Sequence, residues 1–320
     1  MVMRLFPAGV LGVLLLCPTT VLAQGKGGSA MVEGTREVKT FTVGEAGTLR
    51  LSNVAGNVVV TASGGGEIRI ESVKHARGRN DEDARRSLEG VRVEMRQVDS
   101  SVEVKTVHQR GTRSWVDYNV TVPTGTSVEL RSVSGDIQVS NVKGVVRAES
   151  VSGDVTGSGL ARVAALKAVS GDVTLTDGSA DADLSVTSVS GDVTIRSLKG
   201  RNTDVSTVSG DVTINGCECD GVQAQTVSGS ISFASRLAQA GRYAFKSHSG
   251  DIEVATSEGF DLDASTFSGS IRSQVQLTVQ TGSLEGGRGP GRSVRARVGT
   301  GGPYVEVKTF SGDIILTGGR

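Results

Sequence analysis

Aromatic residues, prolines, cysteines and histidines are all rare in this chain of 320 residues. Phe, Trp and Tyr make up 3% of it, and it holds 5 prolines, 3 cysteines and 3 histidines. The histidines show no paired spacing, and neither a nucleophile motif nor a phosphate-binding loop is present, so the sequence gives no basis for a histidine metal site or for nucleophilic catalysis. A narrow core of Val, Ile, Leu and Ala needs few large rings, which favours a thin, repetitive β protein.

An excess of charge of one sign is also lacking. Lys and Arg total 34, and so do Asp and Glu. No overall field therefore favours a nucleic acid or a membrane surface as the partner of this chain.

The chain has one apolar run, Val10–Cys17, which follows Arg4 and precedes a small-residue site ending at Ala23. This order is typical of a secretion signal over Met1–Ala23, and the run is too short to span a bilayer. We expect an exported protein, in the periplasm, on the cell surface or outside the cell, with no transmembrane segment in its mature part.

The chain is rich in one repeated motif, Val-Ser-Gly-Asp-Val, which we expect to form a corner and which has imperfect copies towards the end. Its serines are Ser134, Ser152, Ser170, Ser190, Ser209, Ser228, Ser249, Ser268 and Ser311. The steps between them are 18, 18, 20, 19, 19, 21, 19 and 43 residues. A fixed period near this length is typical of a solenoid, in which each unit buries its apolar face only by stacking on a copy of itself.

Residues on both sides of the corner alternate between apolar and polar, as in Val173-Thr174-Leu175. Alternation predicts strands with one buried face, and the glycine permits a sharp corner. We therefore expect an all-β fold, a right-handed parallel β-helix with turns of about 19 residues. An antiparallel meander, with each corner as a hairpin turn, is the alternative.

The period is interrupted near the N-terminus, which suggests four segments. They are the signal peptide (1–23), a flexible leader (24–37), an N-terminal β region with a short helix (38–126) and the repetitive solenoid (127–320). Asn80–Gly90 carries helix-start and helix-stop residues. This small α/β insertion either caps the solenoid or forms a recognition module. We expect Leu49–Thr61 to start the solenoid and Tyr304–Leu316 to make its final turn.

Two ladders follow from stacking the corners. The first consists of Asp136, Asp154, Asp172, Asp192, Asp211, Asp251 and Asp313. Stacked carboxylates repel each other, so we expect the amides of the turn to compensate them, with calcium as the alternative.

The second ladder is the residue before each corner serine. It is valine in the first six copies and then His248, Phe267 and Phe310. By alternation these side chains point outwards, while those such as Ser150 and Thr207 point in. An exposed apolar stripe is a candidate interaction surface; the alternative is that chain connections half-bury it.

Two further groups are ambiguous. Cys217 and Cys219 are expected in a connection after Ile214, where a bond between them would be strained and ligands to complete a zinc site are missing. A Gly-rich segment, Ser283–Arg297, carries Arg288, Arg292, Arg295 and Arg297. It is either a solvated loop or a contact for an anionic glycan or lipid head group.

Val120-Thr-Val-Pro-Thr-Gly125, the tandem Ser-Gly-Asp-[Val/Ile] corners and Phe310-Ser-Gly-Asp-Ile-Ile together resemble the bacterial "putative adhesin" family of unknown function, over roughly Val38–Leu316. The resemblance implies exported β-solenoids and supplies no catalytic residues or cofactor. We therefore expect a non-catalytic surface or envelope protein whose partner is an envelope protein, a surface protein or a glycan. The alternative is a carbohydrate-binding or polysaccharide-cleaving β-helix, for which only Trp115, Tyr118, Tyr243 and Tyr304 are available as sugar platforms.

Overall fold

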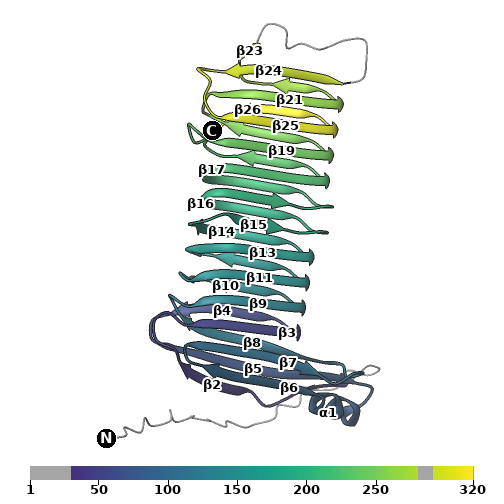
Figure 1. Ribbon diagram of the computed structural model, residues 1–320. Coiled ribbons are helices and arrows are strands. Elements are labelled where there is room, and N and C mark those ends of the chain that lie inside the picture. Colours follow the sequence, from purple (N-terminus) through teal and green to yellow (C-terminus); the bar gives the residue numbers. More distant parts are fainter. Residues whose placement is uncertain (1–29, 280–290, 320) are drawn as a thin grey trace, which may run out of the picture.

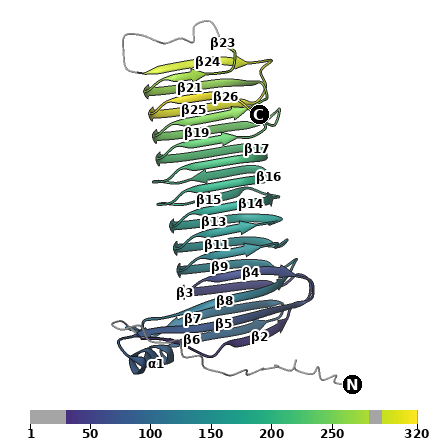
Figure 2. The same ribbon diagram turned by 180° about the vertical axis from the view of Figure 1, so that it is seen from behind.

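The protein forms a long, twisted stack of β-strands with one short helix at its N-terminal end (Figures 1 and 2). The computed structural model describes residues 30–279 and 291–319. The expected signal peptide lies outside the described residues. The fold is all-β, as expected, and its sheet is open. Within the described ranges, no helix is long and apolar enough to cross a membrane.

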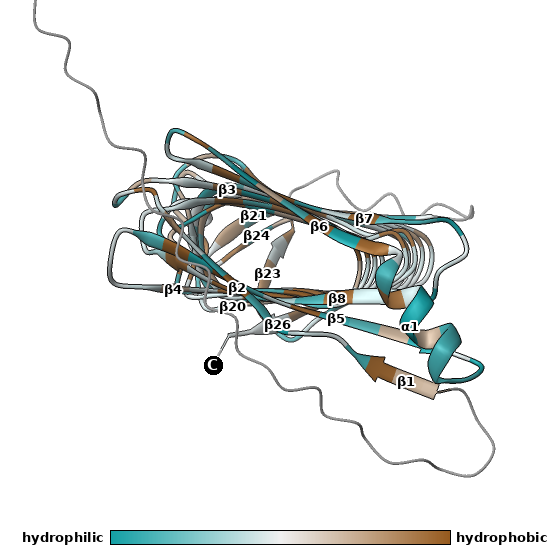
Figure 3. Ribbon diagram, turned by 90° about the horizontal axis from the view of Figure 1, so that it is seen from below, coloured by the Kyte–Doolittle hydropathy of each residue, from teal (hydrophilic) through white to brown (hydrophobic). Residues whose placement is uncertain are grey.

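Seen along the stack, the strands form two layers that face each other (Figure 3). The buried apolar side chains form one core cluster that runs through the stack. In the first regular coil, β9 (Ser127–Ser134) lies in one layer, the corner follows, and β10 (Ile137–Ser140) returns in the other. The next strand, β11 (Val145–Ser152), pairs with β9 in parallel, so that Ser152 lies beside Ser134. The corners are therefore stacked in register and are not tips of separate hairpins.

The first layer contains, in pairing order, β6 (Val91–Val98), β7 (Ser101–His108), β3 (Thr48–Ala55), β9, β11, β13 (Arg162–Ser170), β15 (Leu184–Thr187), β16 (Val193–Ser206), β17 (Val212–Ser228), β19 (Arg242–Ser249), β25 (Tyr304–Ser311), β21 (Phe260–Ser268), β24 (Arg292–Val298) and β23 (Leu277–Val279).

The second layer contains β1 (Ala30–Glu33) and β2 (Glu37–Thr42), which both pair with β5 (Glu67–Gly78), followed by β8 (Ser114–Pro123), β4 (Val58–Ser63), β10, β12 (Val155–Ser158), β14 (Val173–Ala180), β16, β17, β18 (Ile231–Ala234), β20 (Ile252–Thr256), β26 (Ile314–Gly318) and β22 (Ile271–Ser273). The long strands β16 and β17 contribute to both layers because each pairs with one strand in its first half and another in its second.

Alternation along the strands places the core as the sequence predicted. Val173 and Leu175 are fully buried, whereas Thr174 between them is partly exposed. The same two inward positions recur as Val193 and Ile195 in the next coil. Stacked coils therefore supply each other with the apolar neighbours that a single coil lacks.

The order of coils departs from the order of the chain at both ends. At the C-terminal end, β25 pairs with β19 on one side and with β21 on the other. The expectation that Tyr304–Leu316 makes the final turn is therefore wrong, because this coil is inserted between two earlier ones. At the N-terminal end, β3 lies between β7 and β9. The region 38–126 thus contributes two coils to the stack.

Antiparallel strands flank the parallel stack at both ends. Near the N-terminus, β6 pairs with β7 and β5 pairs with β8, while β24 pairs with β21 near the C-terminus. Ala30–Glu33, inside the expected flexible leader, is a strand instead. It is ordered because β5 extends beyond its pairing with β2 and offers β1 an open edge.

The helix α1 (Asp81–Glu89) lies beside the end of β5, at the lower right of Figure 1. The side chain of Asn80 accepts the backbone N–H of Asp83 at 2.8 Å and caps the helix. Gly90 follows its last turn. The capping residues therefore begin and end the helix where the sequence predicted it.

Candidate functional site

Each corner places its glycine against the glycine of the coil before it. Gly153 and Gly171 have φ angles of 146° and 157°, a region that residues with a Cβ rarely adopt. A Cβ on Gly171 would also collide with the carbonyl oxygen of Gly153. Glycine is therefore required here both by the backbone angle and by the close approach of the next coil.

The corner aspartates bond the next coil and not their own turn. Asp172 donates its backbone N–H to Oδ1 of Asp154 at 2.8 Å, and Asp192 donates to Oδ1 of Asp172 at 2.8 Å. The expectation that amides of the same turn would be the donors is wrong, because the stacking brings the next amide within reach. Each carboxylate is thus compensated by a backbone donor.

The same bond links, in stacking order, Asp117, Asn57, Asp136, Asp154, Asp172, Asp192, Asp211 and Ser230, and again Asp251, Asp313 and Ser270. Asn57 and Asp117 were not among the predicted ladder residues. Asn57 belongs to the segment Val54-Ala-Gly-Asn-Val58, which resembles an imperfect copy of the repeated corner and could have revealed it, whereas Asp117 lies outside any repeat.

Small polar residues on the inner side of the corner support the glycine carbonyls. The hydroxyl of Thr207 donates to the carbonyl oxygen of Gly191 at 3.1 Å, and Ser188 bonds Gly171 in the same way at 3.0 Å. Both side chains are buried, as alternation predicted. A buried hydroxyl needs such a partner, so these bonds explain how Ser and Thr are accommodated at this inward-facing position.

The residues before the corner serines form an exposed apolar line, which we call the corner stripe. In stacking order it consists of Val54, Val133, Val151, Val169, Val189, Val208, Val227, His248, Phe310 and Phe267. Its valines are 38–51% exposed. The stripe follows the edge where the arrowheads of β9, β11 and β13 end (Figure 1) and is roughly 40 Å long at one strand spacing per coil.

The aromatic end of the stripe is a continuous ring stack. Phe310 lies between the other two rings, with ring-centre distances of 5.0 Å to His248 and 4.7 Å to Phe267. The rings are nearly parallel, at 9° and 6°. Both faces of Phe310 are therefore covered by neighbours, so this ring presents only its edge to a partner. The insertion of β25 creates this arrangement, which the order of the repeats alone does not reveal.

Cys217 and Cys219 are joined by a disulfide bond. Both lie inside strand β17 and not in a connection, so that position was predicted wrongly. Residues two apart in a strand point to the same side, and both cysteines are buried in the core. Among residues 30–279 and 291–319, no cluster of three or more His, Cys, Asp or Glu could hold a metal ion.

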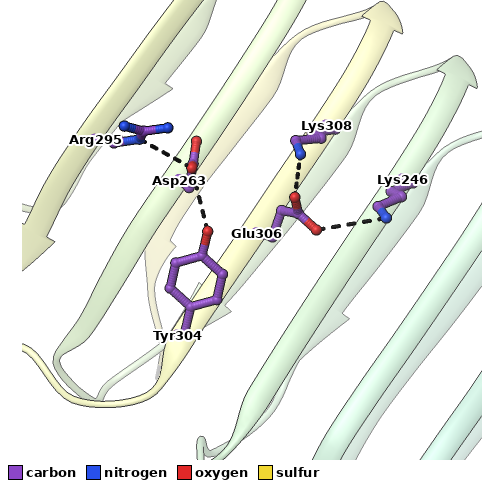
Figure 4. Close-up of polar contacts among 6 residues, drawn as sticks. All are labelled: Lys246, Asp263, Arg295, Tyr304, Glu306 and Lys308. Atoms are coloured by element: carbon purple, nitrogen blue, oxygen red, sulfur yellow. Dashed lines mark hydrogen bonds and ion pairs between the residues drawn. The ribbon is translucent and has the colours of Figure 1, made fainter. Parts of the chain in front are cut away.

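A paired charge cluster covers the outer surface of β19, β25, β21 and β24. Figure 4 shows its residues, which are Lys246, Asp263, Arg295, Tyr304, Glu306 and Lys308. Asp263 accepts from Arg295 at 3.2 Å and from the hydroxyl of Tyr304 at 3.3 Å. Glu306 contacts both Lys308 and Lys246. Opposite charges therefore neutralise each other across neighbouring strands.

Two arginines of the expected basic segment Ser283–Arg297 lie in or beside this cluster. Arg295 and Arg297 sit on strand β24 and pair with Asp263 and Asp261, the second pair at 2.8 Å. They are therefore ion-paired side chains of a strand. Arg288 lies outside the described residues.

In the described part of the chain, three carboxyl groups have shifted pKa values, and all three are lowered. The hydrogen bond from Lys308 lowers the pKa of Glu306, and the backbone N–H of Ser270 holds the pKa of Asp313 below its usual value. Burial would raise the pKa of Glu258, but hydrogen bonds from hydroxyl and amide donors outweigh it and lower that pKa. Each of these groups is stabilised as the anion, which is the opposite of what a general acid requires.

The four aromatic residues considered as sugar platforms lie apart. Tyr118 and Tyr243 are buried, Trp115 stacks on His75 with 5.3 Å between ring centres, and Tyr304 belongs to the charge cluster. Burial raises the pKa of Tyr118 to about 12. They do not form one platform.

Solved structures from Bacteroides fragilis and Parabacteroides distasonis match most of this chain at low sequence identity. A "putative adhesin" from Bacteroides fragilis is 13% identical, with 88% of this chain and 97% of that chain covered and a TM-score of 0.44. A "putative lipid binding protein" from Parabacteroides distasonis is 12% identical with the same coverage and a TM-score of 0.47. A second "putative adhesin", also from Parabacteroides distasonis, has a TM-score of 0.35. No curated protein matches the chain.

The sequence pattern of one family matches residues 120–317, which is more than half of the chain and covers the corner stripe from Val133 onwards. The chain therefore belongs to the Toastrack DUF4097 family.

Proposed function

We propose that this chain is an exported, non-catalytic, right-handed β-solenoid with turns of about 19 residues that acts as an adhesin-like interaction protein of the cell envelope or surface. Its partner is a protein with an elongated apolar surface, which binds along the corner stripe. The observation that carries the proposal is the continuity of the stripe over ten stacked corners.

The physical basis is the apolar area that the stripe leaves in contact with water. The valines from Val133 to Val227 are 42–51% exposed, in one line and without a charged residue among them. Covering the remaining surface of one such valine contributes about 1 kcal/mol. Several together contribute a substantial part of the free energy that an interface needs, and an elongated protein surface can contact many at once.

A protein partner fits the stripe better than a glycan does. Sugars bind aromatic residues by stacking on ring faces, but the faces of Phe310 are covered by His248 and Phe267. The valines offer no hydrogen bonds to hydroxyl groups. The second candidate, a carbohydrate-binding or polysaccharide-cleaving β-helix, therefore has less support at the corner stripe.

The test compares matched substitutions on and off the stripe. Val169→Thr/Val189→Thr places two hydroxyls on the stripe, whereas Val98→Thr/Val279→Thr changes two valines of similar exposure elsewhere. Threonine keeps the β-branched shape that strands favour. Labelled mature protein is titrated onto intact cells and envelope fractions before and after protease treatment of the envelope.

The proposal predicts protease-sensitive binding that the stripe variant weakens by about tenfold or more, whereas the control variant binds like the wild type. Equal binding of both variants contradicts it. Self-association that only the stripe variant loses would identify a second copy as the occupant and would also contradict the proposed partner.

The carbohydrate alternative is tested separately with a glycan array and a reducing-sugar assay on the purified mature chain. Turnover of any polysaccharide would overturn the non-catalytic proposal. Export is tested by mass spectrometry of the protein from envelope and medium, where the proposal predicts an N-terminus at Gln24.

A further inference from the structure

At the N-terminal end of the stack, a cavity of about 420 Å³ opens between the end of β5, the helix α1 and the loop that joins β7 to β8. Its charged lining consists of Arg77, Arg79, Arg86, Arg110, Arg113 and Asp83. Five arginines and one aspartate give the lining a charge of +4. This concentration is unusual in a chain whose positive and negative residues are equal in number.

Four of these arginines lack an ion pair within the described part of the chain. Arg86 pairs with Asp83 at 3.0 Å and with Glu82 at 3.7 Å. Among the residues that the structure describes, the other four have no carboxylate oxygen within 4.0 Å of their guanidinium groups. Gathering like charges around one cavity costs free energy, which an anion would offset.

Backbone contacts hold the three walls of the cavity at fixed separation. The N–H of Gln109 donates to the carbonyl oxygen of Gly90 at 2.8 Å, which ties the β7–β8 loop to the end of α1. The N–H of Arg77 donates to the carbonyl oxygen of Arg113 at 2.8 Å, which ties the same loop to β5. The arginines are thus brought together by the fold and not only by flexible side chains.

The close packing of α1 against β5 also helps to bring the arginines together. A Cβ on Gly78 would collide with the backbone nitrogen of Ala84, so glycine at this position lets the helix approach the strand. Arg77 and Arg79, on either side of Gly78, are both lining residues of the cavity. One short segment at the end of β5 therefore contributes two arginines to the lining.

We propose that this cavity binds a ligand carrying two or more phosphate groups. A guanidinium group matches a phosphate with two parallel hydrogen bonds. Two phosphate groups supply about three to four negative charges as monoesters or pyrophosphate and about two as diesters, so either kind offsets much of the charge of the lining. The volume falls within the range of small-molecule sites. The inference goes beyond the proposed function, since the cavity shares no residue with the corner stripe.

The phosphates can belong to a soluble metabolite or to a lipid head group, and two probes separate these sources. Inorganic pyrophosphate is titrated into the purified chain by calorimetry. Vesicles of phosphatidylcholine with cardiolipin, which carries two phosphates, are compared in flotation with vesicles of phosphatidylcholine alone. Citrate serves as a carboxylate probe of similar charge.

The matched variants remove two positive charges inside or outside the cavity. Arg77→Gln/Arg113→Gln changes the lining, and Arg196→Gln/Arg201→Gln changes two exposed arginines in the middle of the stack. A second cavity variant, Arg79→Gln/Arg110→Gln, guards against a folding defect in the first. Circular dichroism melting curves establish that each variant is folded.

Binding of either phosphate probe supports the proposal if both cavity variants weaken it at least about tenfold and the control variant does not. If only pyrophosphate binds, the ligand is a soluble molecule. If only the cardiolipin vesicles bind, the ligand is a lipid. The proposal is overturned if the wild type binds neither probe at low ionic strength, if the control weakens binding as much as the cavity variants, or if citrate binds as tightly as pyrophosphate.

Discussion

The Oδ1 atom of Asp154 accepts the backbone N–H of Asp172 at 2.8 Å, so a side chain of one coil bonds the corner of the next. Asn57 makes the equivalent bond to the N–H of Asp136 at 3.0 Å without carrying a negative charge. What the corner needs is therefore an oxygen acceptor at this position, and the charge of the aspartate is secondary.

The first prediction concerns this acceptor. Asp172→Ala removes the bond to the N–H of Asp192 and should lower the free energy of unfolding by about 1–2 kcal/mol. Asp172→Asn keeps the acceptor and removes repulsion within the ladder, so its stability should lie within about 0.5 kcal/mol of the wild type. Urea titrations monitored by circular dichroism measure both. Equal losses in the two variants would show that the charge matters more than the acceptor.

The second prediction concerns the corner glycine. Gly171→Ala forces a Cβ against the carbonyl oxygen of Gly153 and should cost about 3 kcal/mol or more. Gly65→Ala is the control, because Gly65 also has a positive φ, 119°, but its Cβ would meet no atom within 4 Å. It should cost only about 1 kcal/mol. Thermal melting compares them, and similar losses would argue against close stacking of the corners.

The third prediction uses the buried hydroxyl of Tyr118, which lies 2.7 Å from the hydroxyl of Thr106. Burial raises the pKa of Tyr118 to about 12 from 10.0. Because this pKa is raised in the folded protein, the stability that the buried neutral hydroxyl contributes is fully present below about pH 10. That contribution is lost as the pH rises towards 12. The unfolded chain releases this proton first, so alkali favours unfolding.

Tyr118→Phe cannot titrate. The difference in unfolding free energy between wild type and this variant should therefore be constant below about pH 10 and shrink by up to roughly 2–3 kcal/mol at higher pH. Urea titrations across this range measure the difference. A difference that stays flat from pH 9 to pH 12 would mean that the Tyr118 hydroxyl is accessible to solvent and not buried.

Much of the fold follows from local patterns. Alternation identified the buried positions such as Val173 and Leu175, and the helix signals around Asn80 marked α1. The outward direction of His248, Phe267 and Phe310 also followed from alternation. These features depend on residues that are neighbours in sequence, where the periodicity of a strand or the capping of a helix decides the outcome.

The order of stacking could not be predicted in the same way. Every corner has nearly the same Ser-Gly-Asp surface. The corner that stacks on the one at Ser249 could therefore be the corner at Ser268 or the corner at Ser311. The pairing of β24 with β21 and the insertion of β25 are decided by contacts between distant segments. The arginine cavity was missed for the same reason, since Arg77 and Arg113 are separated by a helix and two strands in the chain.

The most direct test of the stacked corners is a pair of engineered disulfides at their exposed serines. Ser249 and Ser311 lie opposite each other on neighbouring strands, about 5 Å apart, which suits a disulfide bond. Ser249 and Ser268 lie two coils apart, at about 10 Å, which is too far.

Mass spectrometry of oxidised, non-reduced peptides should therefore show a bond in Ser249→Cys/Ser311→Cys and none in Ser249→Cys/Ser268→Cys. The opposite result, a bond only in the second variant, would mean that the coils stack in chain order. In that case the stacking order, the ring stack around Phe310 and the C-terminal end of the corner stripe described above would all be incorrect.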